Sequence, residues 1–158
     1  MPAHYLACFA LVSAFYHLPP HVLPSIQMVE AGRLGLAAAN RDGSADLGVM
    51  QINTLWVAPL ARYARQPEST IRQRLLHDPC FNIAAAGAIM RIYLNDENGN
   101  LMRAVGNYHS HKPARNQRYQ LKVLEALRAS PSPPLRERLL DERISPIGRS
   151  AAGQAAGR

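Results

Sequence analysis

Apolar residues recur at helical spacing over most of the first 128 residues, which predicts a mainly α-helical chain. Pro24 fits only in the first turn of a helix, so we expect a helix that starts there, continues to Glu30 and ends before Gly32. The uncharged stretch from Tyr5 to Tyr16 predicts another helix of the fold. The other helical segments are expected at Leu47 to Val57, Pro59 to Ala64, Glu68 to Leu76, Pro79 to Leu94, Asn100 to Asn107 and Gln117 to Arg128.

One segment between these helices has the pattern of a hairpin. The residues from Ala37 to Asp46 read AAANRDGSAD, and Asp42-Gly43 is a dipeptide typical of a tight turn. We therefore predict a small β-hairpin or a loop between Gly35 and Asp46.

The composition changes at the C-terminal end. Residues 129–158 contain four of the twelve prolines, together with small and charged residues that bury little surface. We predict one folded domain over residues 1–128 and a Pro/Arg-rich, disordered tail over residues 129–158. Within the tail, Leu135 to Arg143 either forms a short amphipathic helix that docks on a partner or stays solvated.

Charge is distributed unevenly along the 158 residues, which hold 18 Lys+Arg and 11 Asp+Glu for a net charge of +7. The first 100 residues contain seven charges of each sign, so the whole surplus follows Asn100. Such a basic region favours an anionic partner, whether a nucleic acid, a lipid surface or a wall polymer. No run reaches the roughly 18 apolar residues of a membrane-spanning helix, so we expect no transmembrane segment. Because the first Lys or Arg is Arg33, we also expect no signal peptide.

The two cysteines give little chemistry by themselves. Cys8 and Cys80 lie far apart in the sequence, without a CxxC pair or a histidine at the spacing of zinc ligands. They form either one disulfide or two buried thiols, since a disulfide requires an oxidising compartment.

A pair of carboxylates is the first candidate for catalysis. Leu23, Ile26 and Glu30 follow at i, i+3 and i+7, so Glu30 shares the apolar face of its helix and lies in the last turn. Burial and the helix dipole both raise the pKa of a carboxyl group there, as a general acid near neutral pH requires. Asp46 follows at the end of the predicted hairpin. A protonated and an ionised carboxyl group that face each other form the site of a glycosidase.

Four ordered motifs resemble those of the bacterial lytic transglycosylases of the soluble-transglycosylase, lysozyme-like type. They are Glu30-Ala31-Gly32 for an ESG-like motif, Gly48 to Asn53 (GVMQIN) for GLMQIN, Asp78 to Gly87 for the DP..NI..G pattern, and Ala104 to Ser110 (AVGNYHS) for a segment that ends in YNAG or YHS. The resemblance covers about Cys8 to Tyr119. It is greatest to the small enzymes of conjugation and secretion systems, in particular the TrbN type of plasmid transfer. The segment NRDGSADLGVMQIN is also similar to the active-site hairpin of chicken-type lysozymes, where the second carboxylate corresponds to Asp46. Ala31 replaces the usual serine, and Tyr108-His109-Ser110 replaces Tyr-Asn-Ala, but neither departure removes the acid.

The resemblance implies a lysozyme-like catalytic domain over residues 1–128 that acts on peptidoglycan without a cofactor. Family members cleave the β-1,4 bond between N-acetylmuramic acid (MurNAc) and N-acetylglucosamine (GlcNAc) and form a 1,6-anhydro ring. In this chain, the resemblance implies that Glu30 acts first as the acid and then as the base. Asp46 would stabilise positive charge, or act as a nucleophile and allow ordinary hydrolysis. The resemblance also implies sugar-binding roles for Met50, Gln51, Asn53 and Tyr108, a Cys8–Cys80 disulfide, and residence in the periplasm or cell envelope of a Gram-negative bacterium.

Several polar and aromatic residues have weaker claims. His109 and His111 lack a neighbouring carboxylate or thiolate, so we expect no metal site. The basic residues around them suit anionic muramyl peptides. We expect Trp56 in the core and Tyr119 as a packing residue of the last helix.

Two other functions compete with the transglycosylase. A muramidase would hydrolyse the same bond through Glu30 and Asp46. A non-catalytic accessory protein would bind nucleic acid or cell wall, but no helix-turn-helix pattern supports nucleic acid, and we expect none as a partner. We expect a monomer whose partners are peptidoglycan strands and components of a conjugation or secretion apparatus.

Overall fold

The computed structural model describes residues 3–129, and the predicted tail from residue 130 onward lies outside the described residues. Seven α-helices, a short 3-10 helix and a three-stranded antiparallel sheet make up the described chain, which confirms the predicted mainly α fold with a small hairpin. The elements are α1 (Ala3–Phe15), α2 (Val22–Glu30), β1 (Ala37–Ala39), β2 (Ala45–Leu47), β3 (Ile52–Asn53), η1 (Thr54–Trp56), α3 (Val57–Ala64), α4 (Glu68–His77), α5 (Pro79–Asp96), α6 (Leu101–His109) and α7 (Pro113–Ala129).

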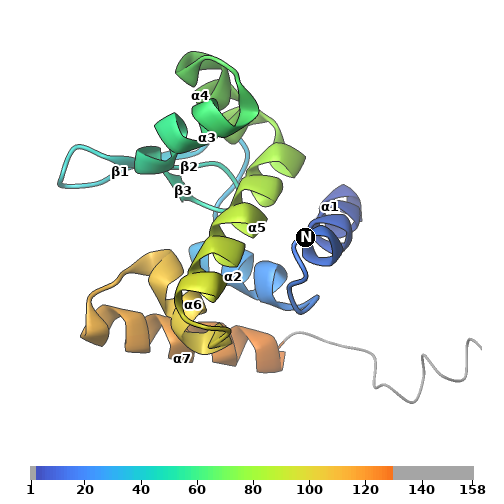
Figure 1. Cartoon of the computed structure of the whole chain (residues 1–158), viewed down its shortest axis with the longest axis vertical. Helices are drawn as coiled ribbons and strands as arrows, with labels where there is room; N and C mark the ends of the chain where they lie inside the picture. The colour runs from blue at the N-terminus through green and yellow to red at the C-terminus, as the bar shows by residue number, and fades with distance from the viewer. Residues whose placement is uncertain (1–2, 130–158) are drawn as a thin grey trace, which may run out of the picture.

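Helix α5 runs through the middle of the molecule (Figure 1), with the sheet, α3 and α4 toward one of its ends and α6 and α7 toward the other. Local sequence signals define its start. The Asp78 side chain accepts a hydrogen bond from the Phe81 backbone N–H at 3.0 Å, and Pro79 occupies the first turn, where it has no N–H to leave unpaired. Helices α1, α4 and α6 pack against α5.

The N-terminal helix is tied to α5 at two places, in its middle and just after its C-terminal end. A disulfide joins Cys8 to Cys80, whose Cα atoms lie 5.4 Å apart. Arg91 on α5 donates from Nε to the carbonyl of Tyr16 at 2.8 Å and from Nη2 to that of His17 at 2.6 Å. The stretch predicted as a helix over Tyr5 to Tyr16 therefore forms part of the fold. Within residues 3–129, no helix is both long and apolar enough to cross a bilayer.

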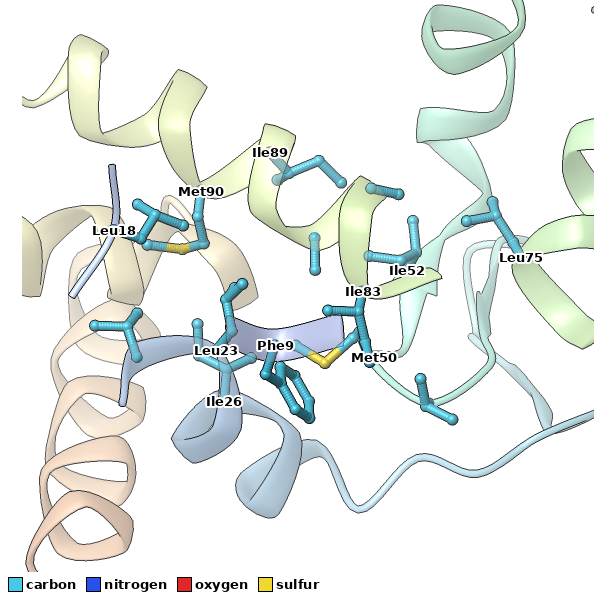
Figure 2. Close-up of a cluster of buried hydrophobic side chains, with 14 of the residues drawn as sticks. Phe9, Leu18, Leu23, Ile26, Met50, Ile52, Leu75, Ile83, Ile89 and Met90 are labelled. Carbon is cyan, nitrogen blue, oxygen red and sulfur yellow. The ribbon is translucent and has the colours of Figure 1, made fainter. Parts of the chain in front are cut away.

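The hydrophobic core lies along α5 and is filled from α1, α2 and the sheet (Figure 2). The buried side chains include Phe9, Leu23, Ile26, Met50, Ile52, Leu75, Ile83 and Met90. Because Leu23 and Ile26 are fully buried, α2 presents the face predicted from its spacing, and that face carries Glu30 at its end.

The predicted hairpin forms, with a third strand added to it. β1 pairs with β2 so that Ala38 lies opposite Asp46, and β2 pairs with β3 so that Asp46 lies opposite Asn53. The turn contains the predicted Asp42-Gly43 dipeptide, and Asp42 Oδ1 accepts hydrogen bonds from the N–H and hydroxyl of Ser44. Asp46 thus occupies the middle strand of the sheet.

The helix expected at Leu47 to Val57 is wrong. The chain instead forms a turn over residues 48–51, then β3 and η1. Gly48 has φ of +73° and Gln51 has φ of +50°, both in the left-handed region. The amide of Asn82, on α5, donates to the carbonyl of Leu47 and accepts from the N–H of Met50, each at 2.8 Å. These backbone groups are thereby unavailable for helical hydrogen bonds.

The other helices form where they are predicted and differ only at their boundaries. Helix α7 starts at Pro113 rather than Gln117, since proline is accommodated in a first turn. Helix α3 starts at Val57 and directly follows η1.

Candidate active site

A cavity of about 480 Å³ opens between the sheet, the end of α2 and the helices α5 to α7. The residues that line it include both candidate carboxylates and come from the sheet with its turns, from η1 and from four α-helices. They are Glu30, Asn40, Arg41, Asp42, Asp46, Gln51, Ile52, Asn53, Trp56, Ile89, Tyr108, His109 and Arg115. The structure therefore brings Glu30 and Asp46, sixteen residues apart in the chain, to one cavity.

Glu30 reaches this cavity because α2 ends abruptly after it. Ala31 adopts a left-handed conformation with φ of 50°, and its N–H donates to the carbonyl of Gln27 at 2.9 Å. Gly32 then passes directly against the turn that follows β2. A Cβ atom on Gly32 would lie 2.4 Å from the carbonyl oxygen of Gly48, so only glycine allows this approach. The Glu-x-Gly motif thus places the acid beside the turn that carries the GVMQIN motif.

The environment of Glu30 suits a general acid. Burial is the largest influence and raises the pKa of its carboxyl group above the ordinary value. The negative charge of Asp46 raises this pKa further, whereas a hydrogen bond from Tyr119 and the positive charge of Lys122 lower it. Burial thus dominates the balance, and the protonated form persists to higher pH than in an exposed glutamate.

Tyr119 is the direct partner of the acid. Its hydroxyl group donates to Glu30 Oε1 at 2.6 Å, from a ring that is 4% exposed. The pKa of Tyr119 is strongly raised, first by burial and then by the charge of Glu30, so the phenol keeps its proton. Only Oε1 of Glu30 accepts this bond, which leaves the second carboxyl oxygen for a reacting group.

Asp46 is held from the neighbouring strand. Asn53 Nδ2 donates to Asp46 Oδ1 at 2.8 Å and to the hydroxyl of Ser44 at 3.0 Å. The Asn53 Oδ1 atom accepts from the N–H of Leu55 at 2.9 Å and so caps η1. The Asn53 amide lines the cavity, but its hydrogen bonds go to the protein, so it orients the carboxylate of Asp46.

The other predicted sugar-binding residues divide into two groups. Gln51 and Tyr108 line the cavity. Met50 does not, because its side chain is fully buried in the core, and the expectation that it lines the groove is wrong. Its backbone contributes instead, since the Met50 carbonyl accepts a hydrogen bond from the Tyr108 hydroxyl at 2.9 Å. Tyr108 lies close enough to Glu30 for that charge to raise its pKa, although burial is the larger cause.

Trp56 is half-buried and lines the cavity, with one ring edge against Tyr93 at a centroid separation of 6.0 Å. It serves both as a packing residue and as a wall of the cavity. The prediction of a core tryptophan describes only the first of these.

The two histidines turn toward different aromatic rings. His109 stacks on Tyr119 with a centroid separation of 4.9 Å and an interplanar angle of 4°, and His111 packs edge-on against Tyr93. Burial and the positive charges of Lys122 and Arg115 lower the pKa of His109. Among residues 3–129 no three His, Cys, Asp or Glu side chains gather as a metal site would require.

The role of Tyr119 is the feature that the sequence does not reveal. Asn116, Tyr119 and Val123 are buried at i, i+3 and i+7, and this spacing predicts a packing face. Nothing in it indicates a hydrogen bond to a residue 89 positions earlier. The motif resemblance singles out Tyr108, whereas the phenol that donates to Glu30 is that of Tyr119.

The fold and the site together define a peptidoglycan-cleaving enzyme of the lysozyme-like class. The model of the transglycosylase SLT domain matches residues 8–123, and this chain belongs to that family of lytic transglycosylases. Among curated proteins, "Invasion protein IagB" of Salmonella typhimurium strains SL1344 and LT2 is 31% identical to it over 130 residues, which is 77% of this chain and 75% of the relative. The protein of the same name from Salmonella typhi has the same identity and coverage.

Proposed function

We propose that this lytic transglycosylase cleaves the MurNAc–GlcNAc bond with Glu30 as its acid and base and leaves a 1,6-anhydro ring on MurNAc. The observation that carries the proposal is the half-buried position of Glu30 at the cavity, with a raised pKa and a phenol bound to one carboxyl oxygen. A carboxyl group of this kind can give up a proton and take one back near neutral pH.

The reaction proceeds in two proton transfers. Protonated Glu30 donates its proton to the glycosidic oxygen, the bond from this oxygen to C1 of MurNAc breaks, and GlcNAc leaves with a free 4-hydroxyl group. The Glu30 carboxylate then accepts the proton of the MurNAc C6 hydroxyl group. The oxygen of this hydroxyl group attacks C1 at the same time and closes the anhydro ring. Glu30 regains its proton and no water is consumed.

Two neighbouring residues support these transfers. Tyr119 fixes the orientation of the acid and stabilises the carboxylate between the two steps, because its hydroxyl donates to Oε1. Asp46, oriented by Asn53, supplies negative charge on the same cavity while C1 carries positive charge.

Asp46 also supports a second reaction. A retaining lysozyme uses its second carboxylate as a nucleophile on C1, and water then hydrolyses the covalent intermediate to a reducing end. Asp46 lies on the middle strand and lines the same cavity as Glu30. If the enzyme hydrolyses the bond, this position favours a mechanism that uses both carboxylates over one that uses Glu30 alone.

Product analysis distinguishes the two reactions. Purified protein is incubated with peptidoglycan sacculi, and the soluble products are identified by mass spectrometry for wild type, Glu30→Gln and Asp46→Asn. Glu125→Gln, an exposed glutamate on α7, is the matched control. We expect anhydro-muropeptides that disappear in Glu30→Gln and persist at a reduced rate in Asp46→Asn. Reducing-end products that disappear in both variants would instead establish a lysozyme, and an unchanged yield from Glu30→Gln would reject Glu30 as the acid.

We also propose that the enzyme works in the periplasm and opens the wall locally for a conjugation or secretion apparatus. The motif resemblance to the small enzymes of such systems, including the TrbN type, supports this context, as does the similarity to the invasion protein IagB. The Cys8–Cys80 disulfide suits an oxidising compartment. Replacement of the chromosomal or plasmid copy by Glu30→Gln should lower transfer or secretion in the host. Unchanged transfer would argue against this role.

A further inference from the structure

A second hollow adjoins the catalytic cavity and is lined almost entirely by basic side chains. It has a volume of about 290 Å³ and is formed by His109, Arg115, Arg118, Tyr119 and Lys122. His109 and Arg115 line both spaces, so the two share a wall. Tyr119 contributes a wall to this hollow while its hydroxyl binds the acid. We call the hollow the α7 basic hollow.

The three cations of the α7 basic hollow lie together without an ion pair in the described chain. Arg115, Arg118 and Lys122 follow at i, i+3 and i+7, which places them on one face of α7. All three are exposed, and none of them forms an ion pair within residues 3–129. Helix α7 contains one acidic residue, Glu125, which forms no ion pair within the described residues either. Like charges that gather without a partner are unfavourable, so the arrangement suits an anionic ligand.

The proposed substrate carries anionic groups on the peptide attached to the sugar that is cleaved. The glycan backbone is neutral, but each MurNAc bears a lactyl group at C3 to which a stem peptide with free carboxylates is attached. Since the bond to be broken starts at C1 of MurNAc, this lactyl group must lie within one sugar ring of Glu30. Lys122 is near enough to Glu30 to influence its pKa, so the basic face begins where the stem peptide would leave the sugar.

We propose that the α7 basic hollow is a subsite for the stem-peptide carboxylates of the MurNAc unit that is cleaved. Arg115, Arg118 and Lys122 form charge-assisted hydrogen bonds with these carboxylates, and His109 forms the boundary between peptide and sugar. The inference rests on the proposed function and adds a substrate requirement to it. The enzyme prefers strands that carry their peptides over strands from which the peptides have been removed.

The test compares two substrates of the same glycan. Initial rates are measured on intact sacculi and on strands stripped of peptides by an amidase, for wild type and for the triple variant R115Q/R118Q/K122Q. The triple variant R62Q/R72Q/R128Q is the matched control, since it removes three exposed cations that line neither cavity.

We expect the α7 variant to lose about tenfold in rate on intact sacculi, because each exposed charge pair contributes a factor of about 1.4 to 5. Arg115 also lines the active-site cavity, the charge of Lys122 lowers the pKa of Glu30, and stripped strands keep a lactyl carboxylate. The readout is therefore the ratio of the two rates: the loss on stripped strands should be smaller than the loss on intact sacculi. The control should retain the wild-type ratio of the two rates. Equal loss of the α7 variant on both substrates, or no loss on either, would overturn the subsite. Salt-dependent binding of a DNA oligonucleotide that disappears in the α7 variant, with an unchanged ratio, would assign the hollow to nucleic acid instead.

The same proteins separate this inference from the proposed function. If wild type releases no product from either substrate, the proposed function fails. Co-sedimentation with intact and stripped material then tests the hollow by itself. Weaker retention of the α7 variant on intact sacculi alone would still support a carboxylate subsite, and equal retention would overturn it.

Discussion

Replacement of Tyr119 by phenylalanine should move the pH dependence of catalysis in a known direction. The change removes the hydroxyl that donates to Glu30 Oε1 at 2.6 Å and keeps the ring that stacks on His109. A hydrogen bond to a charged group is worth about 1.5–3 kcal/mol, and one pKa unit corresponds to about 1.36 kcal/mol. Because the bond favours the ionised carboxyl group, its loss should raise the pKa of Glu30 by about one to two pH units.

The alkaline limb of kcat/KM reports this change, since it follows the pKa of the acid in the free enzyme. We expect the limb of Tyr119→Phe to lie about one to two pH units above that of wild type. Carboxyl-carbon NMR of Glu30, assigned by its absence in Glu30→Gln, should show the same displacement without reference to activity.

Tyr108→Phe is the matched control. Its hydroxyl donates to the carbonyl of Met50 and not to the acid, so its loss should leave the alkaline limb in place. An alkaline limb of Tyr119→Phe that stays at the wild-type position, or moves to lower pH, would refute the role assigned to the Tyr119 hydrogen bond. Equal displacement in both variants would show that the effect comes from the cavity as a whole.

Three stability predictions follow from the same geometry. The pKa of Glu30 is higher in the folded state than in the unfolded state, so wild type loses stability as the pH rises between these two pKa values. Glu30→Gln should therefore be more stable than wild type near pH 7. This difference should disappear below about pH 4, where Glu30 is protonated in both states. Thermal melts of both proteins across this range test it, and a pH-independent difference would contradict it. Asn82→Ala leaves three buried backbone groups without the hydrogen bonds that the Asn82 amide makes to them. At about 1–3 kcal/mol for each group, the free energy of unfolding measured in urea should fall by about 3 kcal/mol or more. A loss below about 1 kcal/mol would be inconsistent with this account. Gly48→Ala should destabilise the protein far more than Gly43→Ala, because a Cβ atom at position 48 would lie 2.1 Å from the carbonyl oxygen of Leu75. At Gly43 the new Cβ atom meets no neighbour, so the cost is that of the left-handed backbone conformation alone, about 1–2 kcal/mol. Similar midpoints of the two variants in urea would refute the clash.

The elements that could be predicted are those whose signals are local. Pro24 at a helix start, Asp42-Gly43 at a turn and the Asp78-Pro79 start of α5 each act through neighbouring backbone groups, so their structures follow from short stretches of sequence. The burial of Leu23 likewise follows from helical spacing and locates Glu30 on the correct face.

The predictions that were wrong or incomplete have a common cause, because each of these features depends on a contact between residues far apart in the sequence. The segment after Leu47 has helical spacing, but Asn82 binds its backbone from 35 residues away and holds it as a turn. Met50 follows the same turn into the core, although its motif suggests a groove residue. Tyr119 has the spacing of a packing residue, and its second role is visible only when α7 lies beside α2.

In the proposed mechanism, these long-range contacts give α7 a part in the chemistry as well as in the packing. α2 provides the acid and fixes its place through the close approach of Gly32 to the turn after β2. α7 provides the hydroxyl of Tyr119 that orients this acid and, on an adjacent face, the positive charge of Lys122 that lowers its pKa. Burial raises the pKa of Glu30, whereas the Tyr119 hydrogen bond and the Lys122 charge lower it. The ability of Glu30 to give and take a proton depends on the balance between these effects. A single helix can therefore adjust both the proton affinity of the acid and the charge that the substrate meets beside it.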